Sequence, residues 1–240
     1  GYISLKIGTI IFARMSSTRL PGKTLIDISG SPLISRVIER ANLISLSSNV
    51  IVATSTDPSD DRLVEYLECE RISFYRGSLY NLVERALGCC QTFGLDAFVR
   101  VCGDRPFIAP DIIDAAIQQF QLIKADLVSS VPEKSLPPGL TTEIVSHQAL
   151  STIANSNLNS KEAEHLTTRF YARNSSHNVQ NLQLSSEIND KEVRLVVDTK
   201  QDLDRARWIT QQLDNPALAT ISQIIQLAQV WISDKKTSYE

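Results

Sequence analysis

The stretch Ile7–Thr24, IGTIIFARMSSTRLPGKT, joins an apolar run to a basic loop. The run from Ile7 to Ala13 is typical of a strand that is buried on both faces of a parallel sheet. The loop carries three cations and three hydroxyl side chains, namely Arg14, Arg19, Lys23, Ser16, Ser17 and Thr18. In parallel α/β sheets ligands bind beyond the carboxyl ends of the strands, so we predict an anion-binding loop here. The alternative is a solvated surface loop that happens to carry three cations.

Working outward, strand and helix patterns alternate at regular spacing through the first half of the chain. The predicted strands are Ile7–Ala13, Asn49–Ala53, Arg71–Tyr75, Asp96–Val101 and Asp126–Ser130. A first helix is predicted to begin at Ser31-Pro32. Three further helices are predicted over Ser59–Glu70, Leu79–Phe93 and Pro110–Leu122. This alternation predicts an α/β fold with a doubly wound, mostly parallel sheet.

The pattern changes after Ser130. Residues 131–140, VPEKSLPPGL, contain three prolines and a glycine, which a central strand or helix does not accommodate. Beyond them we expect strands at Thr141–Ser146, Val179–Leu184 and Glu192–Val197, and helices at His147–Ala154, Lys161–Ala172, Gln201–Leu213 and Leu218–Ile232. We therefore expect one domain over residues 1–240, with an inserted subregion at approximately 132–190.

The bulk composition narrows the function classes. The chain has 240 residues, 42% hydrophobic and 21% charged, with a formal net charge of −3. That charge argues against a nucleic-acid or membrane-surface partner, which a strong basic excess would favour. No apolar run approaches the ~20 residues that cross a bilayer. The four cysteines lack metal-site spacing, and we expect them to be reduced in a cytoplasmic protein.

Two more predicted strands end in a carboxylate. Asp104 follows one strand in the turn Gly103-Asp104-Arg105-Pro106, and Asp198 follows another. If both strands are parallel members of the sheet, Asp104 and Asp198 lie at the same edge as the basic loop. Two carboxylates and several cations suit a polyphosphate bound with Mg²⁺. The alternatives are that Asp104 caps a turn and that Asp198 caps the helix that follows it.

With these residues in hand, the loop Ala13–Lys23, ARMSSTRLPGK, resembles the nucleotide-binding signature of sugar-acid cytidylyltransferases, which include the acylneuraminate and 3-deoxy-manno-octulosonate enzymes. The chain is most similar to the spore-coat polysaccharide biosynthesis branch of this family. Shorter matches follow in order: Val52–Ser55, Tyr75–Ser78, Val101–Pro106, Pro138–Ser146, Glu164–Thr167 and Val197–Leu203.

The resemblance implies a Rossmann-like nucleotidyltransferase fold and the reaction of CTP with a sugar acid to give a CMP-sugar and pyrophosphate for surface polysaccharide biosynthesis. It implies that Arg14, Arg19 and Lys23 bind the triphosphate and that Asp104 and Asp198 hold Mg²⁺, with Arg14, Lys23 and both aspartates catalytic. It places the base and ribose near Ala13, Thr54, Arg76, Gly77 and Ser78, and it implies a homodimer in which the inserted subregion reaches the partner. Glu143 and His165 are the acceptor-side candidates, although a histidine beside Glu164 on a helix is also typical of a solvated face.

The chain departs from the branch pattern on the acceptor side. In the spore-coat branch, aspartates usually stand where this chain has Pro138 and Thr141, and Arg105 puts a bulky cation into the Gly-Asp-x-Pro turn. Two alternatives therefore stay open. A nucleotide-sugar-dependent glycosyltransferase would have a similar half-fold but usually carries Asp-x-Asp, which Gly103-Asp104-Arg105 does not supply. A non-catalytic nucleotide-binding homologue would bind CTP without turnover.

Overall fold

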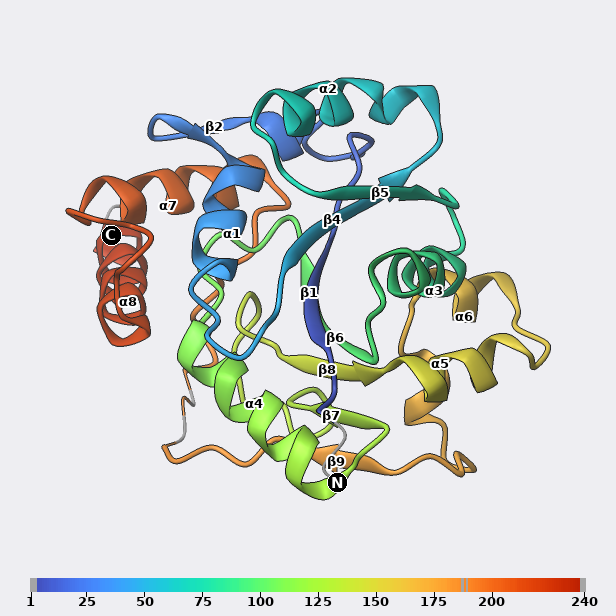
Figure 1. Ribbon diagram of the computed structural model, residues 1–240. Helices are drawn as coiled ribbons and strands as arrows, with labels where there is room; N and C mark the ends of the chain where they lie inside the picture. Colours follow the sequence, from blue (N-terminus) through green and yellow to red (C-terminus); the bar gives the residue numbers. More distant parts are fainter. Residues whose placement is uncertain (1–3, 187, 189, 238–240) are drawn as a thin grey trace.

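A seven-stranded sheet runs through the centre of the computed structural model, which describes residues 4–186, 188 and 190–237 (Figure 1). The order across the sheet is β5-β4-β1-β6-β8-β7-β9. The strands are β1 (Ile7–Phe12), β4 (Val50–Ser55), β5 (Phe74–Gly77), β6 (Ala97–Cys102), β7 (Leu127–Ser129), β8 (Glu143–Ser146) and β9 (Val179–Asn181). A separate two-stranded ribbon pairs β2 (Asp27–Ile28) with β3 (Ser31–Pro32).

Strand β1 is the axis of the sheet. It pairs in parallel with β4 on one side and with β6 on the other, and all six of its residues are buried. The apolar run that predicted a doubly buried strand is explained by this position, because helices cover both faces of a central parallel strand. Only β8 runs antiparallel to its neighbours, between β6 and β7. The predicted α/β fold with a mostly parallel sheet is confirmed.

Helices cover the two faces of the sheet unequally. In Figure 1, α1, α4, α7 and α8 lie on one side and α3, α5 and α6 on the other, while α2 lies beyond β5. The helices are α1 (Leu33–Ala41), α2 (Asp61–Cys69), α3 (Leu82–Phe93), α4 (Pro110–Ile123), α5 (His147–Ala154), α6 (Ser160–Glu164), α7 (Lys200–Gln211) and α8 (Ile221–Thr237). Two separate clusters of buried apolar side chains result, one on each face. None of these helices, within the part of the chain that the structure describes, is long and apolar enough to cross a membrane.

The prediction of a strand at Glu192–Val197 is wrong. The apolar residues Val193, Leu195 and Val197 are buried as the alternating pattern requires, but the segment joins no strand ladder. Its backbone instead binds two loops: Leu195 donates to the carbonyl of Pro138 at 2.8 Å, and Val197 donates to that of Asp104, also at 2.8 Å. The alternating pattern indicates which side chains are buried. It does not indicate whether the backbone of the segment pairs with a loop or with a strand.

Several element boundaries also differ from the sequence prediction. The strand predicted at Arg71–Tyr75 is β5 (Phe74–Gly77), which begins later than predicted and continues through Arg76 and Gly77. The helix expected at Lys161–Ala172 is the short α6 followed by a separate 3₁₀ turn at Thr168–Tyr171. Ser31 and Pro32 belong to the small ribbon, so α1 begins at Leu33. We expect a single domain over residues 1–240. Residues 1–3, 187, 189 and 238–240 of that range lie outside the described residues.

Candidate active site

The basic loop after β1 is held from beneath by a buried aspartate. Asp60 is fully buried and accepts a hydrogen bond of 2.7 Å from the backbone nitrogen of Met15, and its other oxygen accepts one from the hydroxyl of Ser55. From the far side of the loop, Thr24 donates to the carbonyl of Arg14 at 2.7 Å. The loop is therefore fastened at both of its ends. Arg14 and Arg19 are exposed, whereas the Lys23 side chain is largely buried.

Replacing Asp60 by alanine should loosen this loop. The buried Met15 amide would lose its acceptor, at a cost of about 1–3 kcal/mol, and the midpoint of thermal unfolding should fall by about 3–10 °C. Binding of inorganic tripolyphosphate, measured by calorimetry, should weaken roughly tenfold. Asp60→Asn keeps an oxygen acceptor for Met15 and should lose less in both measurements. Equal behaviour of Asp60→Ala and the wild type would show that the loop does not depend on this contact.

A glycine lets the end of β6 approach the end of β1. The amide of Gly103 donates to the carbonyl of Phe12 at 2.9 Å. A Cβ at Gly103 would lie 3.0 Å from the Cβ of Ala13 and 3.3 Å from that carbonyl oxygen, so a larger residue would push the two strand ends apart. Asp104 follows directly and is thereby placed beside the basic loop.

Asp198 reaches the same place by a different route. The neighbouring Asp202 is 4% exposed, and one of its oxygens accepts from the backbone nitrogens of Asp198 at 3.0 Å and Thr199 at 3.1 Å. Thr199 is the N-cap of α7 and forms a capping box with Asp202. The alternative that Asp198 is the helix cap is therefore wrong, because the Asp198 side chain is directed elsewhere.

Lys23 links the two carboxylates. Its Nζ lies 2.7 Å from Oδ1 of Asp198 and 3.5 Å from Oδ2 of Asp104. Arg194 pairs with the second oxygen of Asp198 at 3.1 Å, and the more exposed Arg19 lies 3.7 Å from that oxygen. Asp104 contacts cations rather than capping a turn, since Arg105 lies 3.9 Å from its Oδ1.

An open cavity of about 520 Å³ lies over this cluster. It is lined by residues from the end of β1, the basic loop and the end of β6: Phe12, Ala13, Arg14, Met15, Ser16, Ser17, Thr18, Arg19, Pro21, Lys23, Thr24, Cys102, Gly103, Asp104 and Asp198. A cavity of this size holds a small ligand. The structure therefore brings together six of the residues predicted from the sequence: Ala13, Arg14, Arg19, Lys23, Asp104 and Asp198.

The pKa values of the Asp104 and Asp198 carboxyl groups are shifted in opposite directions. Burial raises the pKa of Asp104 above its ordinary value, Lys23 and Arg105 offset part of that rise, and the charge of Asp198 adds to it. Burial alone would also raise the pKa of Asp198, but the hydrogen bond from Lys23 and the charges of Lys23 and Arg194 hold that pKa below its ordinary value. Asp198 is thus the carboxylate that stays charged, and Asp104 is the one that most needs a cation.

The pair suits a hard divalent cation. Oδ1 of Asp104 is buried and has no hydrogen-bond partner, so this carboxylate can accept a further ligand, while its Oδ2 faces Lys23. Mg²⁺ is typically held by one or two carboxylates, with phosphate oxygens and water completing its shell. No group of three or more potential metal-ligating side chains occurs among the described residues. The arrangement therefore fits a metal that arrives with a phosphate ligand, and the Lys23 ammonium supplies positive charge between the carboxylates.

The other nucleotide candidates lie at neighbouring strand ends, outside the lining of the cavity. Thr54, at the end of β4, is fully buried and its hydroxyl has no hydrogen-bond partner. Arg76 donates to the carbonyls of Ser55 and Asp57 and pairs with Asp61 at 2.7 Å. Gly77 accepts from the amide of Thr56, and Ser78 accepts from the amide of Asn81. These contacts bind the ends of β4 and β5 to each other.

The two acceptor-side candidates are separated from this cavity. Glu143 is 7% exposed and lies in a buried cluster, where it accepts from Arg100 at 3.1 Å and from the hydroxyl of Tyr171 at 2.5 Å. Arg100 also donates to Thr167 at 3.2 Å. His165 is exposed at the end of α6. The short motifs Pro138–Ser146 and Glu164–Thr167 therefore meet at Arg100.

Sequence reasoning missed the residues that support the site. Asp60, Arg194 and Asp202 touch the backbone of the basic loop, the Asp198 carboxylate or the Asp198 backbone rather than line the cavity. Arg85 instead binds the turn that follows β5. Arg85, only 2% exposed, donates to the carbonyls of Ser78 and Leu79, and burial lowers its pKa to about 10. Of these, only Asp202 carried a signal, the Thr-x-x-Asp spacing of a capping box. A lone buried arginine or aspartate has no local pattern that reveals it.

The chain was compared with known proteins. The profile of the cytidylyltransferase family matches residues 9–235. The spore coat polysaccharide biosynthesis protein SpsF of Bacillus subtilis is 28% identical over 225 residues, covering 91% of this chain and 92% of that protein. A 3-deoxy-manno-octulosonate cytidylyltransferase from Chloroherpeton thalassium is 32% identical over 137 residues, and the match spans about half of each chain, 54% and 55%.

Solved structures share the fold. A cytidylyltransferase from Leptospira borgpetersenii superposes with a TM-score of 0.86 at 23% identity, covering 97% of this chain and 96% of its own. A CMP:2-keto-3-deoxy-manno-octonic acid synthetase complexed with CTP superposes with a TM-score of 0.65 at 19% identity, covering 86% and 99%. The Rossmann-like arrangement of the sheet is therefore common to all three chains.

Proposed function

The chain belongs to the cytidylyltransferase family, and on this premise we propose that it transfers the cytidylyl group of CTP to a sugar acid, giving a CMP-sugar and pyrophosphate. One observation carries the proposal: Asp104, Lys23 and Asp198 meet at the edge of a cavity whose other wall is the basic loop. The similarity to a spore-coat polysaccharide protein and to 3-deoxy-manno-octulosonate enzymes supports an acceptor of the sugar-acid class, used for surface polysaccharide.

The reaction requires alignment and charge neutralisation more than covalent catalysis. Arg14 and Arg19 bind the outer phosphates as planar forks, and Lys23 places a compact charge beside the α-phosphate and the leaving pyrophosphate. Asp104 and Asp198 would hold Mg²⁺, which when bound neutralises phosphate charge and orients the triphosphate. Lys23 pairs with both carboxylates, so it would turn toward the phosphates when the nucleotide binds.

The remaining candidates have roles around this centre. Thr54 and the residues Arg76, Gly77 and Ser78 would flank the base and ribose, because they lie at the ends of strands β4 and β5 next to β1. The subregion at 132–190 would form the acceptor side, since it contributes β8, the strand directly beside β6. Glu143 and His165 would belong to that side, Glu143 by holding Arg100 in place.

One assay tests the function. The protein is incubated with CTP, Mg²⁺ and a panel of eight- and nine-carbon sugar acids, and pyrophosphate release is measured. We expect release only when CTP, the metal and a sugar acid are all present. In a parallel incubation with a nucleotide sugar in place of CTP, transfer of the sugar with release of a nucleoside phosphate, and no pyrophosphate, would point to a glycosyltransferase. Calorimetric binding of CTP without turnover on the whole panel would identify a non-catalytic homologue, and both results would contradict the proposal.

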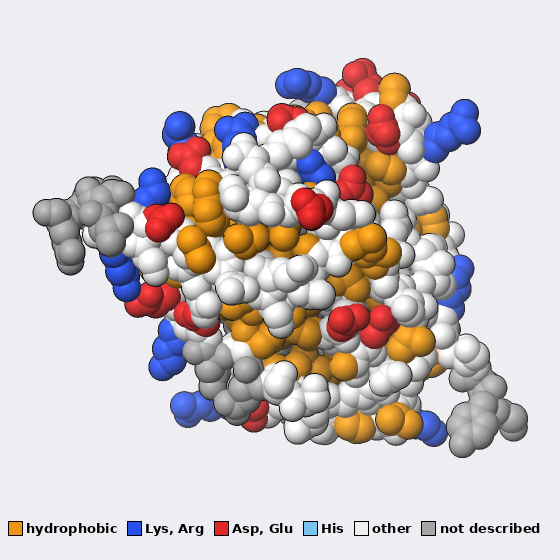
Figure 2. Space-filling view, turned by 90° about the vertical axis from the view of Figure 1, so that its left-hand side faces the viewer, with side chains coloured by type: hydrophobic (Ala, Val, Ile, Leu, Met, Phe, Trp, Pro, Cys, Tyr) orange, Lys and Arg blue, Asp and Glu red, His pale blue; other side chains and the backbone are white. Residues whose placement is uncertain are grey.

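A homodimer in the cytoplasm completes the proposal. CTP is a cytoplasmic metabolite, and all four cysteines are free thiols. Figure 2 shows the side of the molecule that carries α7 and α8, where apolar side chains gather in the middle of the face. Leu218 is 64% exposed and Val230 is 42% exposed, so part of the apolar surface near α8 is unburied in one chain. Sedimentation equilibrium should give twice the chain mass, and a monomer at all concentrations would contradict the dimer.

A further inference from the structure

The order of the strands indicates where the second substrate must approach. The nucleotide cavity lies over the ends of β1 and β6, and the next strand in the sheet is β8. Strand β8 is antiparallel to β6, so its first residues lie at the same edge as Asp104. Thr141 and Thr142 lead into β8 there, and Arg105 follows Asp104 on the other side. An acceptor that reaches the α-phosphate from this direction passes Arg105.

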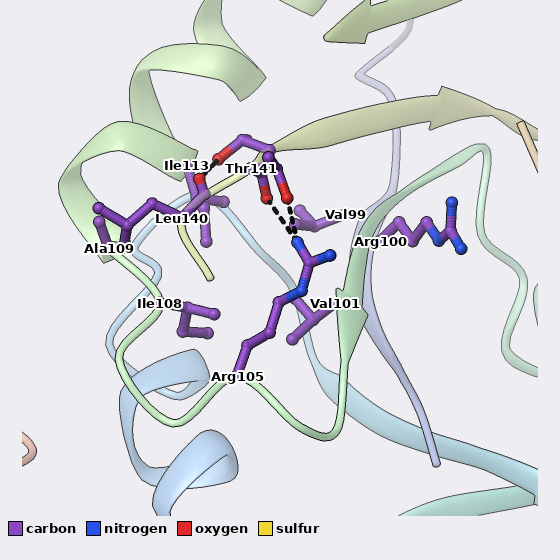
Figure 3. Close-up of a pocket in the computed structure, with 10 residues that line it drawn as sticks. Val99, Arg100, Val101, Arg105, Ile108, Ala109, Ile113, Leu140 and Thr141 are labelled. Carbon is purple, nitrogen blue, oxygen red and sulfur yellow. Dashed lines mark hydrogen bonds between the residues drawn. The ribbon is translucent and has the colours of Figure 1, made fainter. Parts of the chain in front are cut away.

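The side chain of Arg105 bridges the metal-binding turn and the loop before β8. Its Nη1 donates to the hydroxyl of Thr141 and, at 3.4 Å, to the carbonyl of Thr141 (Figure 3). Arg105 lines a small cavity of about 10 Å³ together with mainly apolar residues such as Val101, Ile108 and Leu140. The apolar residues surround the aliphatic part of the Arg105 side chain. The guanidinium group lies at the edge of these residues, beside Thr141.

The guanidinium group of Arg105 is not satisfied by these contacts. Its Nε is buried without a hydrogen-bond partner. The nearest carboxylate oxygen is Oδ1 of Asp104 at 3.9 Å, beyond hydrogen-bond distance, and this oxygen is itself buried and unpartnered. Leaving a buried polar group unpaired is costly. The two adjacent groups therefore need two further partners, a cation for Asp104 and an anion for Arg105.

We propose that Arg105 binds the carboxylate of the sugar acid, an inference that rests on the proposed function. In a cyclised 2-keto sugar acid, the carboxylate and the anomeric hydroxyl are attached to the same carbon. Holding the carboxylate at Arg105 therefore places the hydroxyl beside Asp104 and the α-phosphate. The hydroxyl oxygen then bonds to the α-phosphorus, the bond from that phosphorus to pyrophosphate breaks, pyrophosphate leaves with the electron pair, and the hydroxyl proton passes to solvent.

The second arginine of this region is not available for the same role. Arg100 is paired with the buried carboxylate of Glu143 at 3.1 Å and also donates to Thr167. Its charge is therefore already neutralised by a carboxylate of the chain, whereas the carboxylate nearest to Arg105 is needed for the metal. Arginine also suits the ligand, because its planar fork matches a carboxylate with two parallel hydrogen bonds.

Three variants test the proposal with a binding measurement. Binding of 3-deoxy-manno-octulosonate and of an acylneuraminate is titrated by calorimetry in the presence of Mg²⁺ and a non-hydrolysable CTP analogue. Arg105→Met should weaken sugar-acid binding by about 10- to 100-fold, the usual range for a charged hydrogen bond. Arg105→Lys should recover part of this, because it keeps the charge and loses the fork. Thr141→Val removes the hydroxyl contact with the loop but leaves the guanidinium group and the contact with the backbone carbonyl, and it should change the affinity by less than about threefold.

The outcomes separate this proposal from the proposed function. Equal weakening by Thr141→Val and Arg105→Met would overturn it, because Arg105 would then act only by holding the loop. Unchanged binding in Arg105→Met, or no saturable binding of either sugar acid to a wild-type protein that binds the CTP analogue, would also overturn it. Binding of the CTP analogue itself should be the same in all variants, and its absence in the wild type would contradict the cytidylyltransferase function rather than the role of Arg105. As a last check, wild type should prefer a sugar acid over its C1 amide, and Arg105→Met should lose that preference.

Discussion

Asp198→Asn is expected to lower kcat for pyrophosphate release by about 100- to 1000-fold, a loss of several kcal/mol of charge stabilisation. The amide has the shape of the carboxylate but carries no charge, so it ligates Mg²⁺ poorly and leaves Lys23 and Arg194 without their anion. Asp104→Asn should have an effect of similar size, because it removes the charge of a carboxylate that faces Lys23 and has an unpartnered oxygen. The measurement is pyrophosphate release at saturating CTP over a range of Mg²⁺ concentrations.

A control must show that Asp104→Asn and Asp198→Asn both remain folded. Far-ultraviolet circular dichroism should be unchanged, because the sheet and helices do not depend on either carboxylate. Asp204→Asn, which alters an exposed aspartate on the same helix that follows Asp198, is the matched control and should retain wild-type turnover. If Asp104→Asn and Asp198→Asn both kept normal metal-dependent turnover, the assignment of the two carboxylates would be wrong.

Lys23→Met is expected to change two measurements in opposite directions. Turnover should fall by about 100-fold or more, because the charge beside the α-phosphate and the leaving group is lost. Binding of Mn²⁺ in the absence of nucleotide, followed by electron paramagnetic resonance, should become tighter by about tenfold. The reason is that the Lys23 ammonium, 17% exposed, pairs with both carboxylates and competes with the cation for them.

A control separates this competition from a general loss of positive charge. Lys200→Met removes an exposed ammonium at the start of α7 and should change both measurements by less than twofold. Tighter Mn²⁺ binding in Lys23→Met alone would show that the lysine restrains the metal site until the nucleotide arrives. If Lys23→Met bound Mn²⁺ no more tightly than the wild type, the lysine would not occupy the position of the cation.

Local patterns in the sequence were sufficient to predict the sheet and the basic loop. The run from Ile7 to Ala13 is apolar because β1 is covered on both faces, and this requirement leaves its mark on each residue of the strand. The three cations of the loop, Arg14, Arg19 and Lys23, likewise lie within one short stretch of the chain. The motif order then indicated the family, since the short matches occur from Ala13 to Leu203 in the expected sequence.

Local patterns were insufficient where a side chain depends on a distant partner. Asp198 lies beside Asp104 although the segment before it is not a strand, because Val197 binds the carbonyl of Asp104 and Asp202 holds the turn. The close contact of Leu195 with Gly139, which has a φ of 100° and no room for a Cβ, belongs to the same arrangement. None of these contacts leaves a periodic signal in the sequence. The two carboxylates lie close together as expected, although the predicted strand from which this was inferred does not form.

The sequence by itself thus determined the parallel sheet, the buried strand β1 and the basic loop that follows it, because burial and turn chemistry act on neighbouring residues. Only the tertiary structure decided that Lys23 pairs with both carboxylates, that Asp60 holds the loop from below, and that Arg105 turns to Thr141. These contacts join residues that are 36 to 175 positions apart in the chain, as for Arg105 with Thr141 and Lys23 with Asp198. Their geometry is set by the packing of whole elements, which no short stretch of sequence encodes.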